Sequence, residues 1–193
     1  VLYFTASDGV HGTELWKSDG TSAGTVMVKD INPNSISAIY NLEVFNNLLY
    51  FEANDGVNGE ELWVSDGTEA GTMMLKDINP GSGSSSPSSM SVINNVLYFH
   101  ANDGVHGTEL WKSDGTAGGT VMVKDIDPTG DSRPEWITEL NGEVVFRATV
   151  NANIELWKSN GTDAGTEIVK DINCYDFANF NGEVYFAGND GSG

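Results

Sequence analysis

The sequence has few cysteines, few basic residues and no long apolar segment. Cys174 is the only cysteine, so no disulfide can form within the chain. Nine Lys and Arg residues face 28 Asp and Glu residues, which gives a net charge of −19, whereas nucleic-acid binding depends on clustered cations around the phosphates. No apolar run approaches the ~20 residues that a membrane-spanning helix needs. We therefore expect neither nucleic-acid binding nor membrane insertion.

A tandem repeat runs through the chain. Glu-Leu-Trp recurs at spacings of 47, 48 and 46 residues, beginning at Glu14, Glu61, Glu109 and Glu155. Each copy is followed by Asp-Gly-Thr, or by Asn-Gly-Thr in the last copy, and then by Lys-Asp-Ile. A period of this length indicates an array of supersecondary units, each too small to bury its own apolar face, so that neighbouring units must stack.

Four segments of each repeat have the composition of short β-strands. In the second repeat they are rich in apolar, β-branched and aromatic side chains and cover residues 42–45, 49–52, 61–64 and 72–78. The first two are separated by a pair that tolerates positive φ, as a two-residue type I′ hairpin requires. These pairs are Asn46-Asn47, Asn94-Asn95, Asn141-Gly142 and Asn181-Gly182. Gly-rich loops join the other strands, so each repeat is predicted to be a four-stranded antiparallel meander.

These features predict an all-β fold, namely a β-propeller built from four-stranded antiparallel blades. The strands are apolar on both faces, as expected for sheets that are covered on both sides. A β-solenoid or a string of small sandwiches is the alternative. We expect a single repeat domain over residues 1–193, with blades at residues 1–35, 36–83, 84–130 and 131–173 and a partial blade at 174–193.

The strand that reads Leu-Tyr-Phe or a close variant occurs five times, whereas Glu-Leu-Trp occurs four times. The chain is therefore expected to start and stop within a blade, after processing or truncation of whatever came first. Either the two ends pair to complete a four-bladed ring with one strand left over, or the chain is a segment of a longer propeller. We favour the segment.

The segment Glu14–Thr21, which reads E-L-W-K-S-D-G-T, resembles the repeat of the bacterial E-L-W-x-x-D-G-T repeat proteins. The resemblance covers essentially the whole chain and includes the downstream A-G-T and V-K-D-I-N-P segments. Asn160, which replaces the aspartate in the last repeat, is a departure from the pattern. The resemblance implies a secreted or cell-surface bacterial protein, often placed beside adhesion or export modules, and implies no particular biochemical activity.

Aspartates before glycine in the loops are candidate Ca²⁺ ligands, because acidic Gly-rich loops provide the hard oxygen atoms that Ca²⁺ prefers. These metal candidates are Asp8, Asp55, Asp103 and Asp190. Their spacing is not that of an EF-hand, and an aspartate in such a place is commonly a turn former. Calcium is therefore a candidate cofactor, with a purely turn-forming role as the alternative. His11 and His106 lack metal-site spacing and are expected to be exposed polar loop residues.

Arg133 and Trp136 are the candidate ligand-binding residues. Trp136 is predicted to lie in a linker, and no other repeat has an aromatic residue there. Trp and Arg dominate binding hot spots, so the two could anchor a glycan or a partner protein; Trp136 could equally pack against its own blade. The tryptophans of the Glu-Leu-Trp segments recur at one strand position, which favours packing between blades over sugar stacking.

No arrangement of nucleophile, base and acid is recognisable, and the acidic residues recur in step with the repeat, as architectural residues do. We therefore predict a non-catalytic extracellular module, secreted or at the cell surface. It would serve adhesion to a glycan or an extracellular protein, or structural assembly through self-association. The alternative is a glycan-active enzyme domain with carboxylates in the funnel of the propeller.

Overall fold

The computed structural model describes residues 1–189. This range is all-β: its strands form antiparallel sheets, and none of its residues is helical. The prediction of an all-β chain is therefore confirmed. Within the same range there is accordingly no helix of the length and apolar character needed to cross a membrane.

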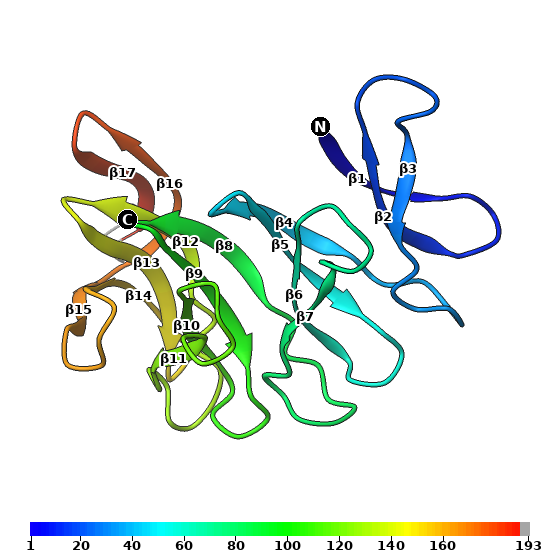
Figure 1. The fold of residues 1–193 in the computed structure, drawn as a ribbon. Helices are drawn as coiled ribbons and strands as arrows, with labels where there is room; N and C mark the ends of the chain where they lie inside the picture. Colours follow the sequence, from blue (N-terminus) through cyan, green and yellow to red (C-terminus); the bar gives the residue numbers. More distant parts are fainter. Residues whose placement is uncertain (190–193) are drawn as a thin grey trace. The chain divides into compact units, whose positions relative to one another are not determined.

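The chain divides into two compact units, Val1–Pro87 and Ser88–Gly193. Unit 1 contains two antiparallel meanders whose strands follow one another in sequence order (Figure 1). The first has three strands, β1 (Leu2–Ser7), β2 (Thr13–Ser18) and β3 (Val26–Lys29). The second has four, β4 (Tyr40–Phe45), β5 (Leu48–Asn54), β6 (Glu60–Ser65) and β7 (Met73–Lys76).

Unit 2 contains two further four-stranded meanders and a β-hairpin. The first meander is β8 (Ser88–Ile93), β9 (Val96–Asn102), β10 (Thr108–Ser113) and β11 (Val121–Lys124). The second is β12 (Glu135–Leu140), β13 (Glu143–Val150), β14 (Asn153–Ser159) and β15 (Thr166–Asp171). The hairpin is β16 (Asn173–Phe180) and β17 (Glu183–Asn189). Within this unit β12 contacts both β8 and β16, so the first strands of the three sheets are neighbours.

The predicted two-residue hairpins are present. Asn46 and Asn47 have φ values of 51° and 61°, and Asn94 and Asn95 have φ values of 51° and 60°. Asn141 and Asn181 are also at positive φ, each followed by a glycine at positive φ. Positive φ at both central residues is the requirement of a type I′ turn, whose twist matches that of the flanking strands. The short polar pairs therefore set the register of the first two strands of each sheet.

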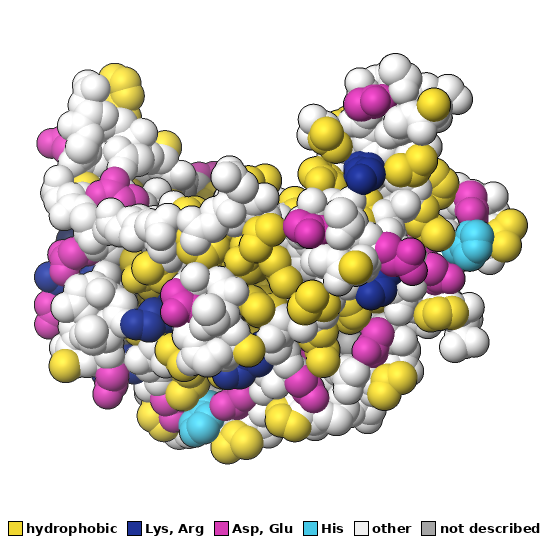
Figure 2. Space-filling model, viewed as in Figure 1, with side chains coloured by type: hydrophobic (Ala, Val, Ile, Leu, Met, Phe, Trp, Pro, Cys, Tyr) yellow, Lys and Arg dark blue, Asp and Glu magenta, His cyan; other side chains and the backbone are white. Residues whose placement is uncertain are grey.

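The acidic side chains fall into two classes. On the face drawn in Figure 2, Asp and Glu side chains are spread over the surface among uncharged ones. By contrast, the glutamate of the Glu-Leu-Trp motif is 0% exposed in the first three repeats, at Glu14, Glu61 and Glu109. A carboxylate can be buried in this way only if hydrogen bonds replace its water.

The buried glutamate holds the end of its own repeat. Glu61 Oε2 accepts a hydrogen bond from the backbone amide of Ile78 at 2.7 Å and from the Ser85 hydroxyl at 2.6 Å. Its Oε1 accepts from the amides of Asn79 at 3.3 Å and Ser85 at 3.1 Å. The predicted strand over residues 72–78 is too long, since β7 ends at Lys76. The chain leaves the sheet there, and the Ile78 amide bonds the carboxylate of Glu61.

Burial changes the acidity of these glutamates. It raises the pKa of Glu61 to about 7, and the nearby Asp77 carboxylate adds to the rise, while the hydrogen bonds from Ser85 and the backbone oppose it. The pKa values of Glu14 and Glu109 are also raised, again chiefly because burial disfavours the charged form. The repeated glutamates therefore have a structural role, and burial makes them weaker acids than exposed glutamates.

Two of the repeated tryptophans, Trp63 and Trp157, pack between neighbouring sheets, as their repetition predicts. In unit 1, Trp63 of the second sheet belongs to one cluster with apolar side chains of the preceding repeat, namely Leu15, Val28 and Ile31. In unit 2, Trp157 packs against a cluster that contains the matching side chains of the preceding repeat, namely Leu110, Val123 and Ile126. Burying one tryptophan removes about 200 Å² from water and is worth up to ~5 kcal/mol.

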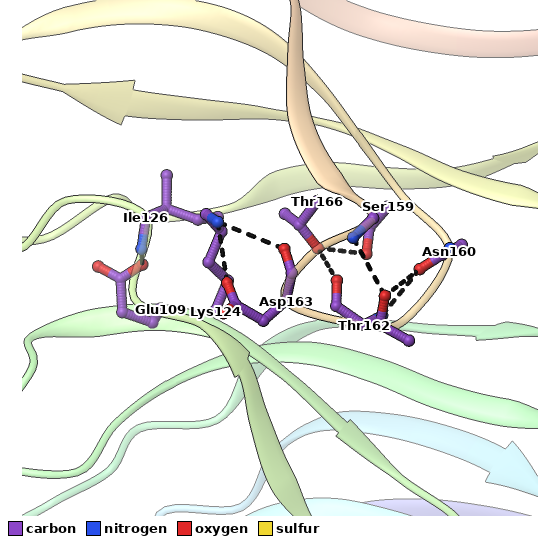
Figure 3. Close-up of polar contacts among 9 residues, drawn as sticks. Glu109, Lys124, Ile126, Ser159, Asn160, Thr162, Asp163 and Thr166 are labelled. Carbon is purple, nitrogen blue, oxygen red and sulfur yellow. Dashed lines mark hydrogen bonds and ion pairs between the residues drawn. The ribbon is translucent and has the colours of Figure 1, made fainter.

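In each of these sheet pairs, a lysine of one sheet also donates a hydrogen bond to a turn of the next. Lys17 Nζ donates to the carbonyl of Gly67 in the next repeat at 2.7 Å, and Lys112 Nζ donates to the carbonyl of Gly161 at 2.7 Å. Lys124 Nζ reaches Asp163 in the same turn region, 2.9 Å from its Oδ1 (Figure 3). The Asp-Gly-Thr or Asn-Gly-Thr turn of one repeat is therefore a docking point for the repeat before it.

The turn itself is held by its first residue. Asp66 Oδ1 accepts hydrogen bonds from the Thr68 amide at 2.8 Å and the Thr68 hydroxyl at 2.7 Å. Asn160 makes the same two bonds to Thr162 in the last repeat (Figure 3). An amide oxygen can replace a carboxylate oxygen as acceptor in an Asx turn, so the departure in the last repeat leaves the turn intact.

Candidate functional site

Trp136 lies at an irregular position in β12. The register between β12 and β13 shifts between Glu135 and Thr138, which marks a β-bulge. Trp136 lies within this bulge at φ 56°, and the residue is 42% exposed. Positive φ is strained for a bulky residue, and strain of this kind costs roughly 1–3 kcal/mol. The structure thus presents an exposed aromatic ring on a strained backbone.

Three other sheets form the same bulge with short polar residues. The corresponding positions in β4, β8 and β16 also have positive φ and also lie at a register shift. They are occupied by Asn41, Ser89 and Asp176. Short polar side chains, Asn and Asp above all, tolerate this conformation because they can bond the local backbone. The bulge therefore belongs to the fold, and only the tryptophan at position 136 is unexplained by it.

Arg133 lies three residues before Trp136, on the segment that enters β12, and its backbone is at φ 45°. Its guanidinium Nη2 is 3.2 Å from Asp131 Oδ2, and the pair is largely exposed. The Asp131 carboxylate also accepts a hydrogen bond from the backbone amide of Thr108 at 2.8 Å. Asp131 thus ties the entry segment to β10, and the Arg133 side chain remains accessible from solvent.

Three further charged or titratable side chains are Glu135, directly before Trp136, and two that bond Pro134 or Glu135. Arg147 of β13 pairs with Glu135 of β12, with its Nε 3.0 Å from Glu135 Oε2 and with Nη2 bonded to the same oxygen. His100 of β9 has its Nδ1 2.8 Å from the carbonyl oxygen of Pro134. Burial lowers the pKa of His100. We call His100, Arg133, Glu135, Trp136 and Arg147 the Trp136 site.

One position of the repeat differs between copies in a way that marks this site in the sequence. His100 and Arg147 occupy one repeat position, opposite the residue before the bulge, and Glu52 occupies it in the second repeat. Burial raises the pKa of Glu52 to about 7, and Asn41 Nδ2 donates to Glu52 Oε2 at 2.8 Å. Residues that change from repeat to repeat therefore gather beside the bulge, whereas recurring residues form the sheets and turns.

The candidate calcium ligands are anchors of their own loops. Asp8 Oδ1 accepts hydrogen bonds from the backbone amides of Val10 and His11, both at 2.9 Å, and its Oδ2 is 2.7 Å from His11 Nδ1. Asp55 and Asp103 make the same contacts in their loops, with Asn58 and His106 in the place of His11. Each of these aspartates therefore forms the turn of its own loop.

The contacts of these loops shift pKa values in two directions. Hydrogen bonds from the His11 backbone and side chain lower the pKa of Asp8, and the Asp8 carboxylate raises the pKa of His11. His106 is raised in the same way by Asp103. Over residues 1–189 no three His, Cys, Asp or Glu side chains converge as a metal site. Asp190 lies outside the described residues, and calcium binding stays a prediction.

Comparisons with known proteins bear on the fold. No protein-family model matches the chain, and no curated protein sequence matches it. A chain from a structural study of two prolyl endopeptidases matches with a TM-score of 0.54 and 12% identity over 94% of this chain, which spans 28% of that chain. An alpha-L-arabinofuranosidase from Clostridium thermocellum matches with a TM-score of 0.43 and 14% identity, over 95% of this chain and 80% of that one.

At 12% identity, the first of these likenesses concerns the fold alone. The described chain is thus an all-β array of antiparallel meanders, similar in fold to part of a much longer prolyl endopeptidase chain.

Proposed function

We propose that this chain is a non-catalytic binding module of the β-propeller type, and that the Trp136 site binds a glycan. The observation that carries the proposal is the exposed Trp136 on a backbone conformation that the other repeats give to Asn, Ser or Asp. A strained residue persists only where the surrounding structure compensates for it, and such residues cluster at binding sites. An exposed indole beside polar and charged groups is suited to stacking on a sugar ring.

The chemistry around Trp136 supports the same ligand class. Arg133 and Arg147 carry guanidinium groups with several donors each, and Glu135 supplies an acceptor. Sugar hydroxyls need both donors and acceptors beside a flat apolar surface. The net charge of −19 disfavours a strongly anionic partner, so we favour a neutral glycan.

The propeller architecture is part of the proposal. It is supported by the tandem four-stranded meanders and by the contacts of β12 with β8 and β16, because the first strands of propeller blades lie side by side around a central axis. The resemblance to the E-L-W-x-x-D-G-T repeat proteins supports a secreted or cell-surface setting in a bacterium. A glycan or an extracellular protein is the partner class that this setting offers.

The test is a glycan array screened with the wild-type chain and with Trp136→Asn. Because Asn41 already occupies this bulge position in β4, Trp136→Asn is expected to raise the free energy of unfolding by about 1 kcal/mol through relief of strain. The same variant is expected to lose glycan binding at least ~10-fold, the usual effect of removing a hot-spot aromatic. Binding would be quantified by calorimetry and stability by urea unfolding.

Tyr40→Asn is the matched control, because Tyr40 is an exposed aromatic on β4, the corresponding strand of another sheet. It should leave glycan binding unchanged. Binding that survives Trp136→Asn would refute the site. Repeating the screen with a calcium chelator tests whether the loop aspartates bind Ca²⁺ that glycan binding needs. Formation of a cleaved product would favour the enzyme alternative. The absence of any bound glycan would favour a structural role.

A further inference from the structure

From residue 183 to residue 188, one edge of β17 is not joined to any other described strand. β17 carries the motif that reads Leu-Tyr-Phe elsewhere, and its counterparts β5, β9 and β13 each pair on both sides, once with the preceding strand and once with a Glu-Leu-Trp strand. Among the described strands β17 pairs with β16 alone. An unpaired strand edge is a template for the addition of another strand.

An apolar cavity of ≈ 200 Å³ lies beside this edge. Its walls include Val145, Leu156 and Val169 of the β12–β15 sheet, and Val184 and Phe186 of β17. Leu156 and Val169 occupy the repeat positions of Leu15 and Val28, and of Leu110 and Val123, the side chains that pack with the tryptophan of the following repeat in each unit.

The exposed fractions of the three equivalent valines show that the packing around Val169 is incomplete. Val169 is 51% exposed, whereas Val28 and Val123 are each 6% exposed. The cavity is therefore the place that the tryptophan of a following repeat fills in the other sheet pairs, as Trp63 and Trp157 do.

Lys158 also lines the cavity, and its contacts differ from those of the lysines at the same repeat position. Its counterparts Lys17 and Lys112 donate to the glycine carbonyl of the next repeat's turn, each at 2.7 Å. Lys158 instead lies 3.2 Å from Glu167 and 3.7 Å from Glu143, both on its own sheet. These ion pairs are partly exposed to solvent and hence weak, so they can be exchanged for a carbonyl acceptor at little cost.

We propose that the β17 edge and its cavity form a docking site for the Glu-Leu-Trp/Lys-Asp-Ile hairpin of another repeat. The Glu-Leu-Trp strand pairs with β17, its tryptophan fills the cavity, and Lys158 bonds the glycine carbonyl of the hairpin turn. Among its described strands, a folded second copy of this chain has no such strand to offer, because β2, β6, β10 and β14 each already pair on both sides. The occupant is therefore a hairpin that is not already part of a complete sheet.

The test uses a fluorescent peptide with the sequence of residues 107–126, titrated with the whole chain in an anisotropy assay. This peptide has two lysines and three acidic residues, so the acidic chain repels it only weakly. We expect saturable one-to-one binding with a Kd in the micromolar range. The peptide that carries Trp111→Ala should bind at least ~10-fold more weakly, because the cavity is then left unfilled.

Protein variants locate the site. Val169→Asp places a charge at the cavity mouth on an already exposed position, and it should weaken peptide binding at least ~10-fold. Val105→Asp, at a residue that is 80% exposed in a loop, should leave binding unchanged. Equal binding of the Trp111→Ala peptide, or no saturation up to about 1 mM protein, would overturn the proposal. The proposal would also be overturned if the chain alone self-associated and Val169→Asp abolished that self-association, because the face would then bind a second copy.

Discussion

At the scale of single residues, the motif glutamate shows how a charged side chain can serve the fold. Glu61 is fully buried and accepts four hydrogen bonds, three from backbone amides and one from the Ser85 hydroxyl. It joins β6 to the end of its repeat and to the linker that leaves it. Without the carboxylate, the amides of Ile78 and Asn79 would lose this acceptor, whereas the amide and hydroxyl of Ser85 would keep only the carbonyl of Glu60. Hydrogen bonds lost in a buried place are costly.

Glu61→Ala is therefore expected to lower the free energy of unfolding by about 3 kcal/mol or more, since four hydrogen bonds to a fully buried side chain are lost at once. The measurement is urea unfolding of the variant and the wild type. Glu155→Ala is the matched comparison, because Glu155 holds the same motif position but is only partly buried and accepts from Trp157 Nε1 at 3.0 Å. It should cost about 1 kcal/mol. Equal effects of the two variants would contradict the structural role given to burial.

At the scale of elements, the two-residue hairpins decide how the first two strands of each sheet pair. Asn is among the few residues other than Gly that accept positive φ, but Gly does so without steric cost. The chain uses Asn-Asn in the β4–β5 and β8–β9 hairpins and Asn-Gly in the β12–β13 and β16–β17 hairpins. The four turns therefore form a natural comparison of the same turn with two residue types.

Asn47→Gly is expected to raise the free energy of unfolding by a few tenths up to about 1 kcal/mol, because the second turn position at φ 61° then carries no steric cost. The midpoint of urea unfolding measures the gain. The reverse change, Gly142→Asn at φ 85°, should lower stability by a similar amount. A loss of stability in Asn47→Gly would show that the Asn47 side chain makes a contact worth more than the relieved backbone.

At the scale of the whole molecule, charge and burial together set the response to pH. Folding raises the pKa of Glu61 and of Glu52 from 4.5 to about 7, chiefly through burial. The folded chain therefore binds more protons than the unfolded chain between these values, and stability falls as pH rises through that window. His11 and His106 act in the same direction, because their pKa values are raised.

Other groups limit this trend. The pKa of His100 is lowered by burial, so the folded chain binds fewer protons at this group than the unfolded chain does. The contribution of His100 to stability therefore increases as the pH rises toward 6.5, the ordinary pKa of histidine, and opposes the effect of the glutamates. Turn aspartates such as Asp66 have pKa values lowered by hydrogen bonds from Thr68, and the stability they provide is lost at acid pH. The net charge of −19 also destabilises the compact chain most strongly at high pH. The stability maximum should therefore lie near pH 5.

We expect the melting temperature to be higher at pH 5 than at pH 8 by about 5 °C or more, as the loss of a few kcal/mol implies for a chain of this size. Scanning calorimetry at 0.5 M salt separates the causes, since salt screens surface repulsion but leaves the buried glutamates largely unaffected. A melting temperature that is independent of pH at high salt would mean that Glu61 and Glu52 ionise in the folded chain as freely as in water.

The strands and the tight turns were predictable from the sequence because their causes are local. Apolar side chains in short runs and Asn-Asn or Asn-Gly pairs act within a few residues, and the repeat states the same pattern several times. The turn role of Asp55 and Asp103 also has a local cause, since each aspartate bonds amides two and three residues ahead. The end of β7 at Lys76 was not predictable, because its cause lies on another strand.

The sequence by itself determined that this protein is a tandem array of all-β meanders, because periodicity and turn chemistry are written along the chain. Only the tertiary structure decided which side chains share an environment. Glu61 meets Ile78 and Ser85, which are 17 and 24 residues away, and Trp136 is distinguished by a bulge that depends on pairing with β13. Such contacts depend on where strands cross in space, and that information becomes visible only when the sheets have formed and packed.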